Sequence, residues 1–491
     1  MKKIQLSLYL VVAAALFLST SSCKKIVEDI NIDPNNPTAA PYTLVLNGAQ
    51  VAGILVYEGN LARTAGMFSR TFTGVDRQYV SVYNYNTSAG DYNDTWDALY
   101  STVIAQAQIV KAEAAAVNDK TTVGIAEVML AQGFGLAADL WGDVPFSEVG
   151  DPDNFPTPKF DAQADVYAGV QKLLDSAILN LTADVGNGPG SKDIYYSGNN
   201  AKWIEAAHTL KARYYLHTKD YANAIVNAQA GISSPANNMM APHGTSYGID
   251  FNVYYSFLTY DRPGYMNSEG AIAPAYLNPD DELYIGNAKT DETARFEYFF
   301  QPELNTGGLD PNVLVDFDWG NPTDENGFFG ASTSFPILTY EENQLILAES
   351  YIKGDHDLAS ALAALNTVRA YLNTGATIGA GYQPDGLMYD PYDLTDFDPG
   401  GIVNPTGSGL TPENALLTEI LKEKYVTLIG QIEQFNDVRR TKNFLNIPPV
   451  RGTSLPQRFL YPQDEINTNP NTPVLTTADL FTPTPVNTTP Y

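Results

Sequence analysis

Cysteine is almost absent from this sequence: Cys23 is the only one in 491 residues. A single cysteine excludes an intramolecular disulfide framework and any zinc site built from several thiolates. Histidine is also scarce, and His208 and His217 lack the spacing by which one helix face presents two zinc ligands. We therefore interpret the four histidines as ordinary hydrogen-bonded or surface residues rather than ligands, and we expect no metal and no cofactor.

Basic residues are few as well. The chain has 28 Lys and Arg against 56 Asp and Glu, a formal net charge of −28. Nucleic-acid binding needs a basic face, so this balance excludes nucleic acid as a partner. It also argues against adhesion to anionic lipid through a polybasic patch. With 44% hydrophobic and 17% charged residues, the composition is that of a globular protein.

Familiar catalytic motifs are missing. No H-E-x-x-H, G-x-S-x-G, Walker or Rossmann glycine pattern occurs, and we read the glycine cluster at 186–190 as a loop. A glycosidase needs two carboxylates at a defined separation, which sequence cannot select among so many acids. We assign no catalytic residue and expect the chain not to be an enzyme.

The N-terminus has the layout of a secretory signal. Lys2 and Lys3 precede the apolar run 4–18, and small residues at 19–22 lead to Cys23. The run is short for a membrane span, although a transmembrane helix is the alternative. We expect no later segment to have the length and apolarity of a membrane span.

A lone cysteine just after the small residues resembles the end of a bacterial lipoprotein signal, despite Thr20 at a position where leucine is usual. The resemblance implies cleavage before Cys23 and attachment of lipid, such as palmitate, to that residue. Ordinary signal cleavage is the alternative. We expect a signal peptide at 1–22, a lipidated N-terminus and tether at 23–41, and a single domain at 42–491.

Helical periodicity dominates the mature chain, which predicts a mainly α fold. Apolar stripes recur over 93–116, 121–140, 162–181 and 413–428, and each is most simply a core face.

Two other segments, 200–232 and 341–372, both read as helix, short break, helix. Their second helices begin alike, with Asp220 and Asp357 each followed by small and branched apolar residues. This resembles the second helix of a tetratricopeptide unit. The alternative is two unrelated amphipathic hairpins. Long irregular insertions are expected at about 233–340 and 373–410, where binding residues tend to lie.

Five motifs in order resemble the SusD/RagB family of nutrient-binding outer-membrane lipoproteins, and they cover nearly all of the mature chain. They are QGFGLAADLWGDVPFSE (132–148), WIEAAHTLKARYYL (203–216), LILAESYIKGDHDLASALAALNTVR (345–369), the late helix 416–440 and QRFLYPQDEINTNP (457–470). Glu423-Lys424 stands where the family commonly has Glu-Arg, which indicates a divergent branch.

The resemblance implies a surface-exposed lipoprotein of the outer membrane that works with a SusC-like TonB-dependent transporter. It implies capture of an oligosaccharide, or of another small nutrient such as a peptide, without catalysis. Contact with the membrane would be through the lipid anchor only. A secreted carbohydrate-active enzyme and a tetratricopeptide-type adaptor that binds only protein are the alternatives.

Aromatic residues are the candidate ligand-binding groups, because flat rings stack on the apolar faces of sugars. Trp319 is the first candidate, with a loop-anchoring core role as the alternative. Tyr79, Tyr83 and Tyr85 come next, with Arg77 as a polar partner. The remaining candidate is Trp96, whose place on a helical stripe favours the core.

The acidic stretch containing Asp316, Asp318, Asp324 and Asn326 has oxygen ligands that calcium accepts. It lacks the glutamate and the spacing of an EF-hand loop. We therefore read it as a solvated acidic loop.

Overall fold

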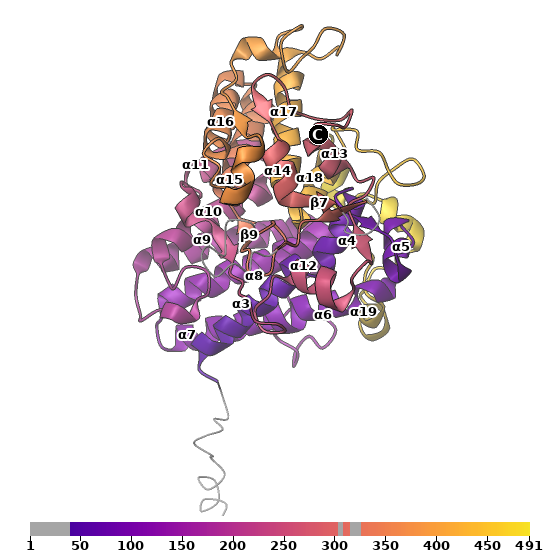
Figure 1. Cartoon of the computed structure of the whole chain (residues 1–491). Helices are drawn as coiled ribbons and strands as arrows, with labels where there is room; N and C mark the ends of the chain where they lie inside the picture. Colours follow the sequence, from indigo (N-terminus) through magenta and orange to yellow (C-terminus); the bar gives the residue numbers. More distant parts are fainter. Residues whose placement is uncertain (1–39, 303–307, 315–325) are drawn as a thin grey trace, which may run out of the picture.

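Helices build most of the structure, a computed structural model that describes residues 40–302, 308–314 and 326–491 (Figure 1). Trp319, the acids at 316, 318 and 324, and Cys23 lie outside the described residues. The main α-helices are α3 (Tyr42–Glu58), α4 (Asn60–Phe68), α5 (Arg77–Tyr83), α6 (Asn93–Asp97), α7 (Ala105–Ala116), α8 (Lys120–Trp141), α9 (Gln163–Ala183), α10 (Asn200–His217), α11 (Tyr221–Gln229), α12 (Val253–Ser256), α13 (Ile272–Leu277), α14 (Thr293–Phe299), α15 (Tyr340–Ser350), α16 (Leu358–Leu372), α17 (Pro412–Thr427), α18 (Ile432–Arg440) and α19 (Gln463–Thr468).

Short π-helical and 3-10 segments extend or connect these helices. The π segments are Ala98–Ile104, Phe257–Asp261 and Tyr351–Asp355. The 3-10 turns are Ala89–Tyr92, Gly190–Lys192, Pro235–Asn237, Ala380–Asp385, Leu394–Phe397, Thr477–Phe481 and Pro485–Thr488. The helices predicted over 93–116, 121–140, 162–181 and 413–428 are confirmed, and the first is made of α6, a π segment and α7.

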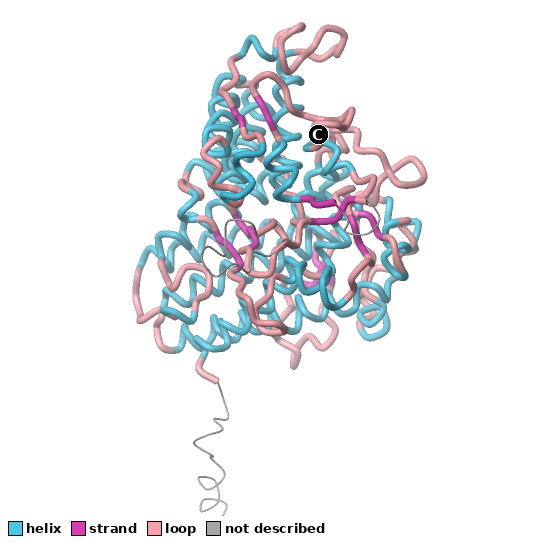
Figure 2. Tube along the Cα trace, viewed as in Figure 1, coloured by secondary structure: helices cyan, strands magenta, loops and turns pink. Residues whose placement is uncertain are grey.

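Strands are short and form antiparallel pairs between helices (Figure 2). The pairs are β1 (Thr73–Gly74) with β5 (Met266–Asn267), β2 (Val144–Pro145) with β3 (Phe160–Asp161), β4 (Met239–Ala241) with β9 (Phe335–Leu338), β6 (Thr290–Asp291) with β10 (Met388–Tyr389), and β7 (Phe300–Pro302) with β8 (Leu309–Pro311). Several lie within 233–340. That range was expected to be irregular, yet its described part also holds α12, α13 and α14.

Helix α8 lies at the centre of the core. Within the described residues it is the one helix that is long and apolar enough to cross a membrane. The expectation that no segment after the signal has this length and apolarity is therefore wrong. Its apolar window is entirely buried inside the protein, as in a core helix. Small residues let the neighbours approach closely, since a side chain at Gly135 would overlap the ring of Tyr214 on α10.

Two helix pairs confirm the paired-helix prediction. Helices α10 and α11 pack on each other, as do α15 and α16, and α11 packs on α15. Asp220 and Asp357 cap the second helices by accepting hydrogen bonds from Asn223 N and Ser360 N. Ala361 is fully buried in the seam, where a small side chain permits close contact.

Buried ion pairs join these helices to one another and to the late part of the chain. Arg440 on α18 donates to both oxygens of Glu349 on α15, at 2.5 and 2.6 Å. Arg213 on α10 donates from its Nε and Nη2 to the two oxygens of Glu342, at 2.7 and 2.6 Å. Breaking either pair would leave a charge buried without its partner, so these contacts fix how the helices pack.

Candidate functional site

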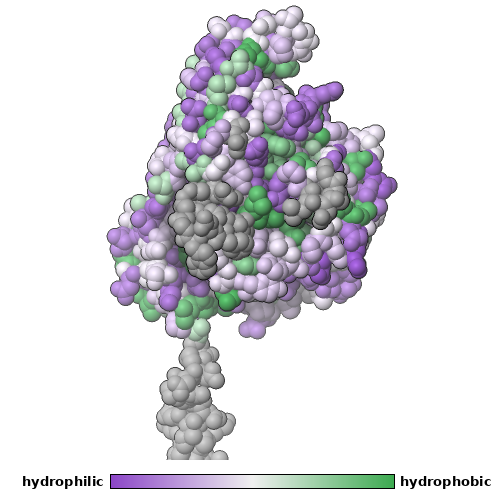
Figure 3. Space-filling model, in the orientation of Figure 1, coloured by the Kyte–Doolittle hydropathy of each residue, from purple (hydrophilic) through white to green (hydrophobic). Residues whose placement is uncertain are grey.

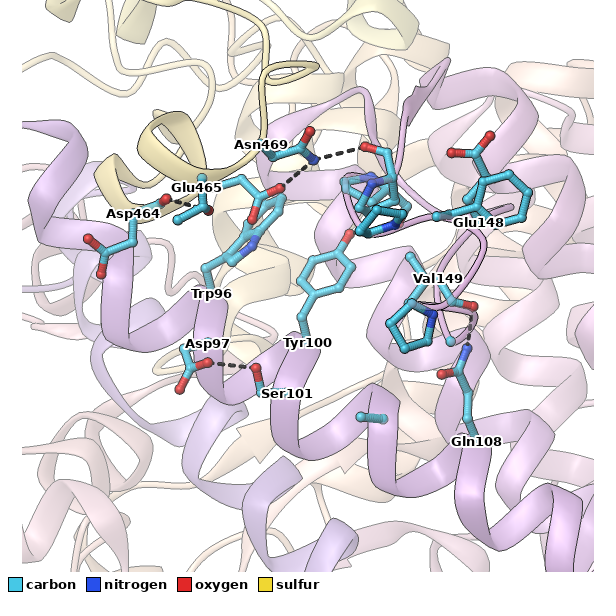
Figure 4. Close-up of a pocket in the computed structure, with 18 of the residues that line it drawn as sticks. Trp96, Asp97, Tyr100, Ser101, Gln108, Glu148, Val149, Asp464, Glu465 and Asn469 are labelled. Carbon is cyan, nitrogen blue, oxygen red and sulfur yellow. Dashed lines mark hydrogen bonds between the residues drawn. The ribbon is translucent and has the colours of Figure 1, made fainter.

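A cavity of about 870 Å³ opens between three segments that are distant in sequence (Figure 4). One wall is the helical stretch 93–112. A second is the loop 145–158, whose ends are held together by the pairing of β2 with β3. The third is 462–469, which contains α19. This volume lies within the range typical of small-molecule sites.

Two aromatic rings form much of the helical wall. The rings of Trp96 and Tyr100 have centroids 4.5 Å apart and planes 31° apart. Trp96 is held from behind by Trp141, which meets it edge-on at 5.1 Å and 86°. Tyr100 lies in the π segment Ala98–Ile104, and such irregular turns often occur at functional positions. The pair is therefore a rigid surface on which a flat apolar face can stack.

Tyr100 is a neutral group in this wall. Its hydroxyl donates to the carbonyl of Pro145 at 3.0 Å, which ties the helical wall to the loop. Burial, together with the negative charge of Glu465, holds the pKa of Tyr100 well above its usual range. The phenol thus stays protonated at physiological pH.

The rim is polar and anionic. The neutral side chain of Asn469 links the third wall to the loop, because its amide donates to the carbonyl of Pro158 at 2.8 Å. The same amide donates to Glu465 Oε1 at 2.8 Å. Four carboxylates line the cavity, from Asp97, Glu148, Asp464 and Glu465, and no lysine or arginine among the described residues does. The cavity consequently disfavours anionic ligands and suits neutral or cationic ones.

The Trp96 indole N–H is available to a ligand. No group among the described residues accepts a hydrogen bond from it, and it is not among the enclosed unpaired polar atoms. Phe155 stands at the mouth with 40% of its surface exposed. The cavity therefore offers aromatic faces, a free donor and several acceptors, which is what a sugar ring requires.

Of the predicted ligand residues, Trp96 lines this cavity, although only 6% of its surface is exposed. Arg77 does not line it. That side chain is exposed, lies 3.6 Å from the carboxylate of Asp76, and sits 5.7 Å from the ring centre of Tyr265. The structure thus separates Arg77 from Trp96.

The tyrosines predicted beside Arg77 point elsewhere. Tyr79 is buried against Phe257, and its hydroxyl accepts from Arg63 Nε at 3.2 Å. Tyr85 is buried as well, and its hydroxyl accepts from Val450 N at 2.9 Å. Tyr83 is half-buried. None of the three lines the cavity, and their role in ligand binding stays a prediction.

Most residues that line the cavity were not among the predicted ligand residues. Tyr100 lies on the apolar stripe 93–116, which was predicted to face the core. Glu465 and Asn469 lie in the motif 457–470, which indicates the family but not a ligand site. One signal was available: Pro145, Pro152, Pro156 and Pro158 concentrate in one loop. Such a loop is rigid and cannot join a regular helix.

One buried cluster has residue types that bind metals: Asp139, His217 and Glu433. His217 Nδ1 lies 2.7 Å from Asp139, and its Nε2 lies 3.3 Å from Glu433. The two ring nitrogens therefore face different carboxylates across the ring. We interpret the cluster as a charged hydrogen-bond network of the core.

On the face shown in Figure 3, apolar residues lie in small patches among hydrophilic and neutral ones.

Comparison with known proteins finds a family model that matches part of the chain. Residues 34–265 match the SusD-like_2 family model, described as starch-binding and associating with the outer membrane. No curated protein matches the chain.

Solved structures share the fold over most of the chain. A SusD/RagB family protein from Bacteroides thetaiotaomicron is 20% identical with a TM-score of 0.62, over 88% of this chain and 95% of the other. A chitin-binding SusD homolog from Flavobacterium johnsoniae is 15% identical with a TM-score of 0.61, over 87% and 93%. A chitin-binding protein is 20% identical with a TM-score of 0.58, over 87% and 94%. The chain thus resembles a SusD-like family model over residues 34–265 and has the fold of SusD-like proteins over most of its length.

Proposed function

We propose that this protein captures a neutral oligosaccharide in the cavity around Trp96 and Tyr100. We further propose that it is anchored to the outer membrane by lipid on Cys23. From there it delivers the ligand to a SusC-like TonB-dependent transporter. The observation that carries the proposal is the stacked Trp96–Tyr100 pair in a cavity rimmed by carboxylates.

The physical fit is to sugars. A pyranose ring has apolar C–H faces that pack on aromatic rings, while its hydroxyls donate to carboxylates and accept from N–H groups. The cavity supplies both, through the aromatic pair and through Glu148, Asp464 and Glu465. Four carboxylates without a lining cation would repel uronic acids and sulfated sugars.

The comparisons support this ligand class. The family is described as starch-binding, and two of the structural neighbours are described as chitin-binding. Both polymers are neutral, in agreement with the charge of the cavity. The transporter partnership and the anchor follow from the family resemblance and from the predicted signal and tether at 1–41.

The binding test uses Phe155, an exposed aromatic residue whose loss removes no core volume. Phe155→Ala should weaken binding of a maltooligosaccharide or chitooligosaccharide by roughly 1–2 kcal/mol, about the value of one aromatic contact. Phe481→Ala is the matched control, because Phe481 is 37% exposed and does not line the cavity. Calorimetric titration gives the affinities, and thermal melts check that both variants fold.

Equal affinities for Phe155→Ala and Phe481→Ala would remove the cavity from the proposal. If neither neutral glycan binds the unaltered protein while a peptide does, the ligand class is wrong. Copurification with a TonB-dependent barrel tests delivery separately.

A further inference from the structure

A second cavity lies away from the first, between α14, β9, α15 and the C-terminal end of α16. It encloses about 300 Å³, at the lower end of the volumes of small-molecule sites. No residue lines both cavities. Figure 1 shows α14, α15 and β9 next to one another in the middle of the molecule.

The lining of this cavity includes a buried carboxylate with one unpaired oxygen. Glu341, the second residue of α15, lines the cavity and is 8% exposed. Its Oε2 is enclosed and forms no hydrogen bond. The side chains of Asn238 and Thr339 hydrogen-bond to this carboxylate, which leaves Oε2 as its unpaired acceptor.

The nearby guanidinium does not neutralise Glu341. Arg295 also lines the cavity, but its Nη2 donates to Glu423 at 3.0 Å and its Nη1 lies 3.4 Å from Glu292. Burial raises the pKa of Glu341, as expected for a carboxyl group removed from water without a matching cation. An enclosed acceptor left unpaired costs free energy, which a ligand donor would recover.

The walls are aromatic and hydroxyl-bearing. Phe299 and Phe328 have ring centres 4.6 Å apart, and Tyr298 meets Phe328 edge-on at 5.9 Å and 82°. Thr333 and Thr427 also line the space, with their hydroxyls donating to Gly327 O and to Glu423. Apolar faces beside several hydroxyls and one free acceptor match a ring that carries its own hydroxyl or amino donors.

We propose that this cavity is a second ligand site, which binds a single sugar ring by a hydrogen bond from the ring to Glu341 Oε2. The choice of a sugar rests on the proposed function, whereas the site itself does not involve the Trp96 cavity. Its small volume admits one ring and excludes the longer chain that the first cavity accommodates.

The experiment is a titration of the purified protein with glucose, N-acetylglucosamine and glucosamine, followed by ligand-observed NMR. Glu341→Gln should weaken binding of the preferred ring by about tenfold to hundredfold, the loss of one charge-assisted hydrogen bond. Ser334→Trp, at the exposed mouth, should block the site without altering the core. Glu282→Gln, on an exposed glutamate outside both cavities, should leave binding unchanged. Stronger binding of glucosamine would indicate an ionised Glu341 facing an ammonium group.

Two results would overturn the inference: no ring binds the unaltered protein, or Glu341→Gln and Ser334→Trp bind as it does. A lowered melting temperature of Glu341→Gln with unchanged affinity would show a purely structural carboxylate. Phe155→Ala should not alter the binding of single rings here. If oligosaccharides fail to bind but single rings bind in a Glu341-dependent way, the proposed function fails and this site remains.

Discussion

The His217 network makes a quantitative prediction about pH. His217 is buried between the carboxylates of Asp139, at 2.7 Å, and Glu433, at 3.3 Å. Burial alone would lower the pKa of His217. The two carboxylates outweigh burial and raise that pKa to about 9.

The sign follows from linkage. In the unfolded chain the imidazole has its ordinary pKa of 6.5, so the folded state binds the proton more tightly. Stability from this proton is fully present below pH 6.5 and is lost as pH rises through about 9. The difference in pKa corresponds to a contribution on the order of 3 kcal/mol to the free energy of unfolding.

The assay is urea unfolding at a series of pH values from about 6 to 10. Other groups also titrate there, including Glu292 with a pKa of about 7 and Lys219 with a pKa of about 8. The measured quantity is therefore the difference between the unaltered protein and His217→Gln. That difference should shrink as pH rises.

The exposed His356, beside Glu413, gives the control. The variant His356→Gln should follow the unaltered protein closely. A difference between the unaltered protein and His217→Gln that does not change with pH would refute a protonated imidazole in this network.

Three further changes test the core, the scaffold and the anchor. Trp96→Ala should cost about 3–5 kcal/mol of stability, because the indole packs on Trp141 as well as lining the cavity. An unchanged melting temperature of this variant would contradict that packing. Ala361→Phe should overpack the α15–α16 seam and cost about 1–3 kcal/mol in chemical denaturation; full stability would argue against a close seam. Cys23→Ala should release the protein from membranes, and retention in the outer-membrane fraction after a high-salt wash would disprove the anchor.

The helices could be predicted because burial leaves a periodic record in the sequence. Val166, Val170 and Leu174 recur at helical spacing, and all three are fully buried in α9. The repeated Asp220 and Asp357 mark helix starts, because an aspartate side chain caps free backbone N–H groups.

The ligand residues could not be predicted in the same way. Tyr79 was predicted as a ligand-binding aromatic, yet its ring packs on Phe257, far along the chain. The main cavity likewise forms between segments that are distant in sequence, namely 93–112, 145–158 and 462–469. Contacts of this kind are set by tertiary packing, which local periodicity does not record.

The apolar character of helix α8 also bears on the proposed export of the chain across the inner membrane. Under the export proposed above, the chain would pass the inner membrane unfolded, so this apolar helix would meet lipid before it meets its packing partners. A central aspartate raises the cost of insertion into the bilayer by about 2.5–3.5 kcal/mol. Glu127, inside the helix and buried once it folds, would therefore oppose arrest of the helix during translocation, whereas Asp139 lies in its last turn, where the cost is smaller. Once the chain has folded, Glu127 binds Lys111 and Asp139 binds His217, so Glu127 would serve both passage and structure.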